Sequence, residues 1–325
     1  MANGNRANGM FQLEFERPLV ELENRIADLE QAADGEGRGF STEVRKLRQS
    51  HRALLKKTYE KLSPWQTVQV ARHPTRPQSV DYIRAFVKDF CELHGDRRFG
   101  DDHAMVTGFG RVGPHKCLIV GQHKGRDTKE KVAANFGCAH PEGYRKALLK
   151  MKLAEKFGLP VVTLIDTAGA YPGVGSEERG VAEAIAVNLR EMARLRVPIA
   201  CLVIGEGGSG GALGIGVGDR VAMMQYAWYS VISPENCSAI LWRDGDHAPD
   251  AAQQLNLTAP QNLKLGIIDE VIEEPMGGAH RDPDAAAQSV EAWLSKTLRD
   301  LKRFKIDNLV RRRYDKFRAM GEMSD

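Results

Sequence analysis

Two short apolar runs, each followed by a glycine-rich segment, dominate the middle of the chain. The first is Val161–Ile165, bounded by Pro160 and Asp166, and the second is Val197–Ile204. Between them, Ser176–Arg196 carries apolar residues at helical spacing. This order predicts a βαβα unit with a parallel sheet. Both glycine segments would follow the carboxyl ends of strands, where parallel sheets bind their ligands.

The same periodicities predict elements on either side of this unit. Apolar residues at 4-3-4-3 spacing from Phe15 to Leu29, and a second amphipathic stretch that stops before Pro64, predict a helical hairpin. The pattern leaves open whether this hairpin packs on the chain's own body or contacts another subunit. We further expect a helix over Val80–Leu93, a β-hairpin of Met105–Val112 and Lys116–Gln122, and a helix from Pro141 to Phe157. A strand-like segment Val221–Ile232, a turn at Ser233–Glu235 that leads into Asn236–Trp242, and a terminal helix Val290–Leu301 follow.

Composition and charge are those of an ordinary globular protein. The 325 residues are 42% hydrophobic and 27% charged, and a net charge of +3 is too small to indicate nucleic acid. The basic residues between Lys302 and Arg313 indicate a solvated helix face. No apolar run reaches the about 20 residues that span a bilayer. The N-terminus has no signal-peptide pattern, so we expect a cytoplasmic protein with no membrane association.

The five cysteines are scattered, odd in number and form no C-x-x-C pair. They suit a reducing compartment and argue against a structural zinc in this chain. Cys117 and Cys201 fall within apolar strands, which indicates small core residues rather than nucleophiles.

The segment Gly205–Gly211 matches several short motifs that fail on context. It contains G-x-G-x-x-G, but the following strand, Val221–Ile232, lacks the acidic residue that a dinucleotide site requires. It is not a phosphate-binding P-loop, because Ala212 and Leu213 stand where that motif needs Lys and Ser or Thr.

The same segment contains G-x-S-x-G, centred on Ser209, and Asp219, Asp269 and His280 follow in hydrolase order. Such residues are expected downstream by chance, and the flanking glycines predict a pliable loop rather than a strained elbow. A serine hydrolase using Ser209, or a standalone hydratase, is the alternative enzyme. A non-catalytic scaffold is favoured only by the amphipathic ends.

The glycines themselves can supply the chemistry. At a helix N-terminus the N–H groups of Gly210 and Gly211 can form an oxyanion hole, with no Cβ to block a ligand. Five glycines in seven residues exceed what packing needs. In the other glycine segment, Tyr171 offers a flat ring for a planar ligand, whereas Asp166 and Thr167 indicate turn and cap residues.

Long motifs make the sequence resemble a known family. DTAGAYPGVGSEERG, VIGEGGSGGALGIGVGD, HKGRDTKEKVAANFG and EPMGGAHRDP resemble the alpha subunit of the bacterial-type acetyl-CoA carboxylase carboxyltransferase. The resemblance implies an α/β, crotonase-like (ClpP/crotonase) fold of stacked ββα turns. On this basis we expect residues 1–77 to be a tail and helical hairpin that contacts a subunit, 78–283 the carboxyltransferase core, and 284–325 an amphipathic helix and basic tail.

The resemblance also implies that this chain is half of an enzyme. Its partners would be a carboxyltransferase beta subunit in an α2β2 assembly, a biotin carboxyl carrier protein and biotin carboxylase. The implied reaction moves a carboxyl group from carboxybiotin, on the carrier, to acetyl-CoA, and gives malonyl-CoA for fatty acid synthesis. No metal is expected in this chain, and ATP would be used only by biotin carboxylase.

Residue roles carry over by motif. Gly210 and Gly211 would hold the biotin ureido oxygen, with equivalent donors for the enolate on the beta subunit. The implied substrate-binding residues are Gly207, Gly208, Gly169, Ala170, Tyr171, Lys124 and Arg126. For the two cations a solvated loop is an equally good interpretation.

Overall fold

The computed structural model describes residues 4–7, 10–33 and 40–321, and an eight-stranded sheet lies at its centre. The strands are β3 (Val87–Glu92), β4 (Met105–Val112), β5 (His115–Gln122), β6 (Val161–Thr167), β7 (Ile199–Gly208), β8 (Arg220–Met224), β9 (Trp228–Ser230) and β10 (Glu270–Ile272). They lie in the order β10-β8-β7-β6-β5-β4-β3, with β9 paired to β7. The pairs from β5 to β10 are parallel, whereas β4 pairs antiparallel with β3 and β5.

The predicted βαβα unit is confirmed, with two differences. The expected single helix is broken at Gly180 (φ 78°) into α7 (Val174–Glu178) and α8 (Val181–Arg194). The prediction of a glycine loop over Gly205–Gly211 is wrong for Gly205–Gly208. These residues continue β7, and Glu206–Gly208 pair with β9. The chain then enters α9 (Ser209–Leu213) directly.

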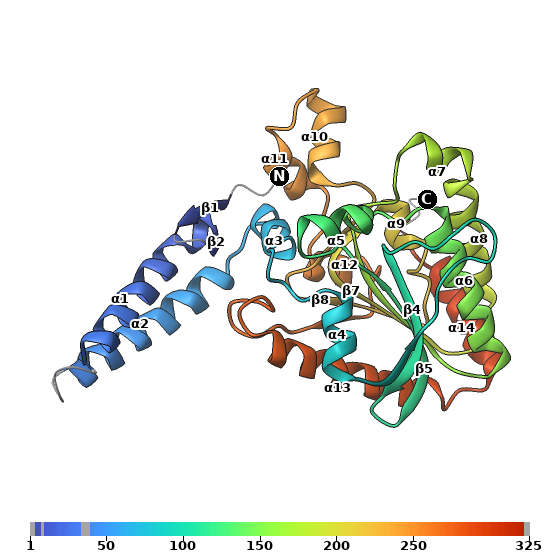
Figure 1. The fold of residues 1–325 in the computed structure, drawn as a ribbon, viewed down its shortest axis with the longest axis horizontal. Coiled ribbons are helices and arrows are strands. Elements are labelled where there is room, and N and C mark those ends of the chain that lie inside the picture. The colour runs from blue at the N-terminus through green and yellow to red at the C-terminus, as the bar shows by residue number, and fades with distance from the viewer. Residues whose placement is uncertain (1–3, 8–9, 34–39, 322–325) are drawn as a thin grey trace.

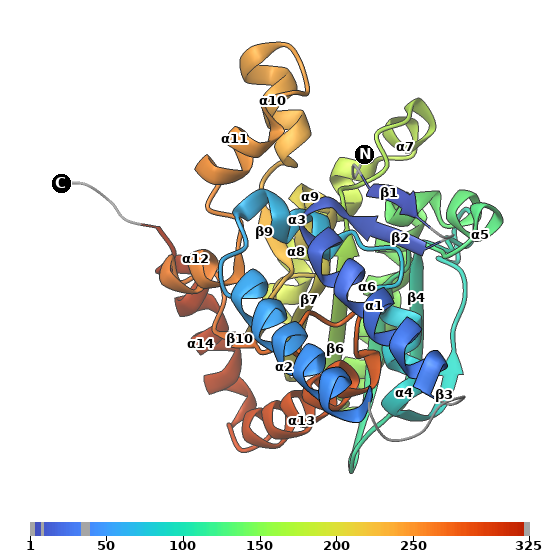
Figure 2. The same cartoon turned by 90° about the vertical axis from the view of Figure 1, so that its left-hand side faces the viewer.

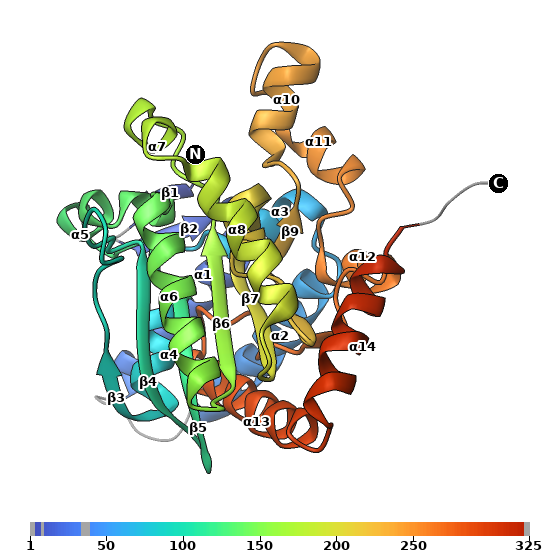
Figure 3. The same ribbon diagram turned by 90° about the vertical axis from the view of Figure 1, so that its right-hand side faces the viewer.

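Helices cover both faces of the sheet. On one face α6 (Pro141–Lys156) and α8 pack side by side, and α14 (Ile306–Arg318) packs against α8 (Figure 3). On the other face lie α4 (Ser79–Phe86) and α13 (Pro283–Leu301) (Figure 1). The parallel strands buried between these layers are mostly apolar, as in β6, where every residue is buried and the polar residues are Thr163, Asp166 and Thr167.

The predicted N-terminal helices are confirmed as α1 (Arg17–Ala33) and α2 (Phe40–Tyr59), preceded by the hairpin of β1 (Gly4–Ala7) and β2 (Met10–Leu13) and by η1 (Glu14–Glu16). The two helices lie side by side and project away from the sheet (Figures 1 and 2). A second small core anchors their base, formed by Leu13, Leu19, Leu55, Tyr59, Val70 and Tyr226.

Several peripheral elements differ from the sequence predictions. The expected helix over Val80–Leu93 is wrong beyond Phe86, because β3 pairs there with β4 and this tertiary pairing overrides local propensity. The segment before Arg72 is an unpredicted helix, which a capping box of Ser63 and Gln66 begins. The remaining elements are α3 (Pro64–Ala71), α5 (Thr128–Ala133), η2 (Asn135–Gly137), α10 (Pro234–Trp242), α11 (Ala248–Gln254) and α12 (Ala259–Lys264). No helix in the described part of the chain is long and apolar enough to cross a membrane.

The basic C-terminal helix α14 does not expose all of its cationic side chains to solvent. Arg313 of α14 is 1% exposed and lies 2.7 Å from a carboxylate oxygen of Asp219. Its guanidinium also donates to the main-chain carbonyls of Met192, Leu195 and Val197. The prediction of a solvated helix face is therefore wrong at Arg313. This side chain instead fastens α14 to the end of α8 and to the segment that leads into β7.

We predict that Arg313→Met lowers the free energy of unfolding by about 3–5 kcal/mol, because it leaves Asp219 buried and unpaired. Arg196→Met is the matched control, since the pair of Arg196 and Asp307 also reaches α14 but is solvent-exposed. That change should cost at most about 1 kcal/mol. Urea denaturation measures both, and equal losses would contradict the assigned role of Arg313.

Candidate active site

The first loop of the site follows β6. The hydroxyl of Thr167 donates to the carbonyl of Gly169 and accepts from its N–H, so Thr167 is the turn residue that the sequence predicts. The N–H of Tyr171 donates to the carbonyl of Ala139. The Tyr171 ring is 36% exposed and lies 4.3 Å, between centroids, from the ring of His140. The loop therefore presents a partly exposed aromatic face at the carboxyl end of β6.

The second part of the site is the junction between β7 and α9. Its N-cap residue is Gly208, which has no side chain to accept from the first turn of the helix. Ser209 has φ 50°, a left-handed conformation that non-glycine residues seldom adopt. The expected pliable loop is thus the end of a strand followed directly by a helix, whose strained first residue, Ser209, precedes the two glycines.

The glycines of this junction differ in how much space surrounds the position that a Cβ would occupy. A Cβ at Gly208 would clash with the main chain of Ala168, and one at Gly211 would lie 2.6 Å from the nitrogen of Ala170. Gly205 and Gly207 are also crowded, by the side chains of Asp166 and Tyr229. The prediction that these glycines exceed what packing needs is therefore wrong for Gly205, Gly207, Gly208 and Gly211. It holds for Gly210, where a Cβ would find its nearest neighbour, Ile185, at 3.7 Å.

Buried charges lie directly behind this junction. The Nζ of Lys124 is 2.6 Å from Oδ1 of Asp166 and 2.6 Å from Oε2 of Glu206. Asp166 also accepts the N–H of Glu206, so it joins the ends of β6 and β7 and is more than the predicted turn residue. Lys124 is largely buried, and its interpretation as part of a solvated loop is wrong.

The network extends to a projecting helix. Nε of Arg72 lies 2.6 Å from Glu206, and its guanidinium also contacts Glu235 in the first turn of α10. Burial alone would raise the pKa of Glu206, but the positive charges of Lys124 and Arg72 outweigh it and lower that pKa to about 2. Glu206 is therefore ionised at neutral pH and holds both cations in place.

Arg126 points to a different part of the surface. Its guanidinium contacts Asp81 and donates to the carbonyl of Pro74 at 3.2 Å. Its side chain is 40% exposed. The structure does not bring Arg126 into the network of Lys124, and a substrate-binding role for either cation stays a prediction.

Three buried polar side chains hold α9, two near its start and one at its C-terminal end, and no sequence motif singles them out. The amide of Gln122 donates to the carbonyl of Gly211 at 2.8 Å and accepts from the N–H of Asp166 at 3.0 Å. The hydroxyl of Tyr144 donates to the same Gly211 carbonyl at 3.4 Å. Asn188 donates to the carbonyl of Gly214. The only sequence signal was a polar residue at the end of an apolar strand, at Gln122.

The residues that a Ser209 hydrolase would use are engaged elsewhere. Asp219 is paired with Arg313, and Asp269 with Lys316 at 2.9 Å. His280 lies in a cluster with Glu16 at the base of the N-terminal hairpin. The structure therefore gives Ser209 no catalytic triad from these three residues.

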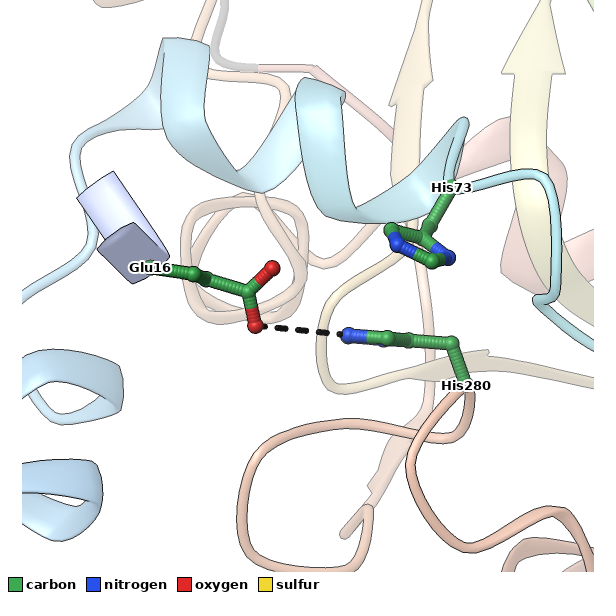
Figure 4. A group of neighbouring side chains, drawn as sticks. All are labelled: Glu16, His73 and His280. Carbon is green, nitrogen blue, oxygen red and sulfur yellow. Dashed lines mark ion pairs between the residues drawn. The ribbon is translucent and has the colours of Figure 1, made fainter. Parts of the chain in front are cut away.

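Glu16, His73 and His280 place their ligand-type atoms within 4.8 Å of one another, as a metal site would (Figure 4). The bonding does not fit an ion. The N–H of Thr75 donates to Nδ1 of His73, which puts the ring proton on Nε2. The two rings stack with centroids 4.2 Å apart, so their in-plane lone pairs cannot converge on one ion.

The carboxylate of this cluster is already neutralised. Arg281 donates to Oε1 of Glu16 at 2.9 Å, and the hydroxyl of Tyr59 donates to the same oxygen at 2.7 Å. Burial, followed by the charge of His280, lowers the pKa of His73 to about 4. The cluster is best explained as the polar anchor that fastens the N-terminal segment to the core.

The chain matches the family model described as acetyl co-enzyme A carboxylase carboxyltransferase-like over residues 12–321. It is 53% identical over 309 residues to the acetyl-coenzyme A carboxylase carboxyl transferase subunit alpha of Rhodopirellula baltica, covering 95% of this chain and 97% of that protein. It is 52% identical over 313 residues to the subunit of the same name from Azoarcus sp., covering 96% and 98%.

Solved structures share the fold at lower identity. A transcarboxylase 12S structure matches with a TM-score of 0.52 and 23% identity, over 67% of this chain and 42% of that one. The beta subunit of P. aeruginosa geranyl-CoA carboxylase matches with a TM-score of 0.53 and 19% identity, over 72% and 44%. These likenesses confirm the predicted crotonase-like α/β fold.

We predict that Gly211→Ala destabilises the protein and Gly210→Ala does not. The Gly211 methyl group meets the main chain of the neighbouring loop, and overpacking of this kind costs about 1–3 kcal/mol. At Gly210 there is room, and alanine in a helix is favoured over glycine by about 0.5–1 kcal/mol. Chemical denaturation of the two variants tests this, and a stable Gly211→Ala protein would show that the two loops do not meet as described.

Proposed function

The chain belongs to the acetyl-coenzyme A carboxylase carboxyltransferase family, and we propose that it forms the alpha half of a split active site that carboxylates acetyl-CoA. The family makes it a subunit of a transferase. The proposed reaction moves the carboxyl group from carboxybiotin, presented by a carrier protein, to the methyl carbon of acetyl-CoA, and the product is malonyl-CoA. One observation carries the assignment of the site: Gly210 lies in the first turn of α9, and packing does not require a glycine there, because a Cβ would make only an ordinary contact with Ile185 at 3.7 Å.

We propose that the N–H groups of Gly210 and Gly211 donate to the ureido oxygen of biotin. Both belong to the first turn of α9, where N–H groups have no helical acceptor, and Gly208 at the N-cap cannot satisfy them. Backbone donors fixed in this way stabilise charge as it develops on the oxygen, and loss of one such donor costs about 2.7–4 kcal/mol in the transition state. The residues present therefore fit a planar ligand with a single acceptor oxygen.

The neighbouring loop would hold the rest of the bicyclic ring. Gly169 and Ala170 bring their main chain against Gly211, and Tyr171 supplies the exposed aromatic face beside it. The main chain of Gly207 and Gly208 sets the entry to the helix. Lys124 and Arg126 remain proposed contacts for the carboxylate of the ligand. That carboxylate would share Lys124 with Asp166, and Arg126 with Asp81.

This arrangement needs no catalytic side-chain acid or base from the chain. Carboxybiotin supplies the carboxyl group and, once that group has left, a basic ureido nitrogen. The chain's own part is to bind and orient the ureido group and to exclude water around it. The buried pair of Lys124 and Glu206 keeps the sheet end electrostatically balanced behind the donors.

The proposed partners are a beta subunit in an α2β2 complex, the biotin carrier, and biotin carboxylase as the user of ATP. Helix α10 is the proposed contact for the beta subunit. It exposes apolar side chains, with Ile240 70% and Leu241 64% accessible, and Glu235 ties its first turn to the site network. In Figure 1, α10 projects from the same end of the molecule as α7 and α9. The N-terminal hairpin, whose helices also project, is a second proposed subunit contact.

We predict that malonyl-CoA forms from carboxybiotinylated carrier and acetyl-CoA only when this chain is combined with its beta subunit. Gly210→Val in the combined enzyme should lower kcat at least about 100-fold, because the side chain fills the space in front of the donors. Gly210→Ala, which adds only a methyl group, should lose less. Activity of the chain alone would refute the split site, and a fully active Gly210→Val enzyme would place the oxyanion donors elsewhere.

Association with the beta subunit should depend on α10. Ile240→Asp is expected to raise the dissociation constant at least about tenfold, because it places a charge within a buried apolar contact. The control is Phe157→Asp, at an apolar residue of similar exposure (62%) that lies at the opposite end of α6 from the site. Analytical ultracentrifugation or interferometry measures both. Unchanged association of Ile240→Asp would exclude α10 from the interface.

A further inference from the structure

Helix α9 is too short and too rich in glycine to be stable by itself, so its orientation depends on neighbouring elements. It has five residues, Ser209–Leu213, and two of them are glycines. Isolated helices of this length are unstable in water, and glycine disfavours the helix further. No side chain caps its N-terminus. The direction in which its first N–H groups point must therefore be set by contacts from other elements.

The strongest of these contacts comes from Gln122 at the end of β5. This side chain is fully buried (0% exposed), and both ends of its amide are used. Nε2 donates to the Gly211 carbonyl and Oε1 accepts from the N–H of Asp166. One side chain thus spans the end of β6, from which the first loop departs, and the start of α9.

The second donor to the Gly211 carbonyl is weaker. The Tyr144 hydroxyl lies 3.4 Å away, compared with 2.8 Å for Gln122. Burial raises the pKa of Tyr144, so its hydroxyl stays protonated, but the longer contact cannot replace the shorter one. Gln122 therefore sets the rotation of the Gly211–Ala212 peptide, which directly follows the two peptides that carry the Gly210 and Gly211 N–H groups. At this point the main chain of Gly211 meets that of Gly169 and Ala170.

We propose that Gln122 is a positioning residue for carboxyl transfer: it locks the Gly211–Ala212 peptide and the start of the β6 loop into one frame. The turn of α9 from which the Gly210 and Gly211 N–H groups project is thereby fixed. This inference rests on the proposed function. Gln122 touches no substrate, and it acts through the peptide that it holds. Because a misplacement of about 1 Å can cost about 100-fold in rate, one buried amide is sufficient to matter.

The test exploits the two ends of the amide. Gln122→Glu keeps an acceptor for the Asp166 N–H, but it can donate to the Gly211 carbonyl only while the new carboxyl is protonated. Burial raises the pKa of such a carboxyl. The ratio of its kcat to that of the wild type should therefore fall at least about tenfold as the pH rises through that pKa. Ionisation of a buried carboxyl also lowers the stability of the fold, so circular dichroism at each pH must give the folded fraction. A fall in kcat that persists after correction for that fraction distinguishes positioning from unfolding.

The second variant removes both bonds at nearly constant volume. Gln122→Met in the assembled enzyme should lower kcat at least about tenfold at every pH, with the KM for acetyl-CoA within about twofold of the wild type. The control is Trp293→Phe, which removes the part-buried hydrogen bond from the buried Trp293 side chain to Glu270 at the edge strand β10. Its kcat should be unchanged once the folded fraction is corrected for.

The outcomes separate this inference from the proposed function when Gly210→Val is assayed alongside. An inactive Gly210→Val enzyme together with wild-type kcat and pH profile in both Gln122 variants would overturn the positioning role alone. A fully active Gly210→Val enzyme would overturn both. A fall in kcat for Trp293→Phe equal to that for Gln122→Met would show that loss of a side-chain hydrogen bond far from the site has this effect, and would also overturn the inference.

Discussion

The close approach of two backbones at Gly211 is the constraint on which the site depends. There the start of α9 lies against the loop of Gly169 and Ala170, at a distance that no side chain permits. Parallel pairing of β6 with β7 brings these two segments to the same edge of the sheet. Gln122, from the next strand, then fixes their relative rotation. The surface that would meet a ligand is thus made of main chain, and its accuracy comes from the sheet.

Charge compensation behind this contact follows from the same topology. The carboxyl ends of three neighbouring strands bring Lys124, Asp166 and Glu206 together in a buried space. An uncompensated charge there would be costly, and the low pKa of Glu206 shows that the cations outweigh its burial. Through Arg72 the network also reaches α10. The helix proposed to contact the partner subunit is therefore joined, through Arg72, to the buried charges behind the site.

Much of the fold could be predicted because it rests on local periodicity. The run Val161–Ile165 and its repeat at Val197–Ile204 gave the parallel core, and amphipathic spacing gave the N-terminal hairpin. The predictions failed where long-range pairing decides the structure. Val87–Glu92 has helical spacing but pairs with β4, and the glycines up to Gly208 look like a loop but pair with β9. Within the site, the glycines were recognised, whereas their supports at Gln122 and Asn188 were not.

The sequence by itself determined the family, the parallel sheet, and the edge of that sheet at which the two glycine segments lie, because these follow from motifs and from the order of strands and helices. Only the tertiary structure decided what each residue there does. It made Asp166 and Lys124 partners in a buried network, gave four glycines a packing role, and left Gly210 open. The physical reason is that hydrogen bonds such as that from Gln122 to Gly211 join residues 89 positions apart, and no local pattern encodes that distance.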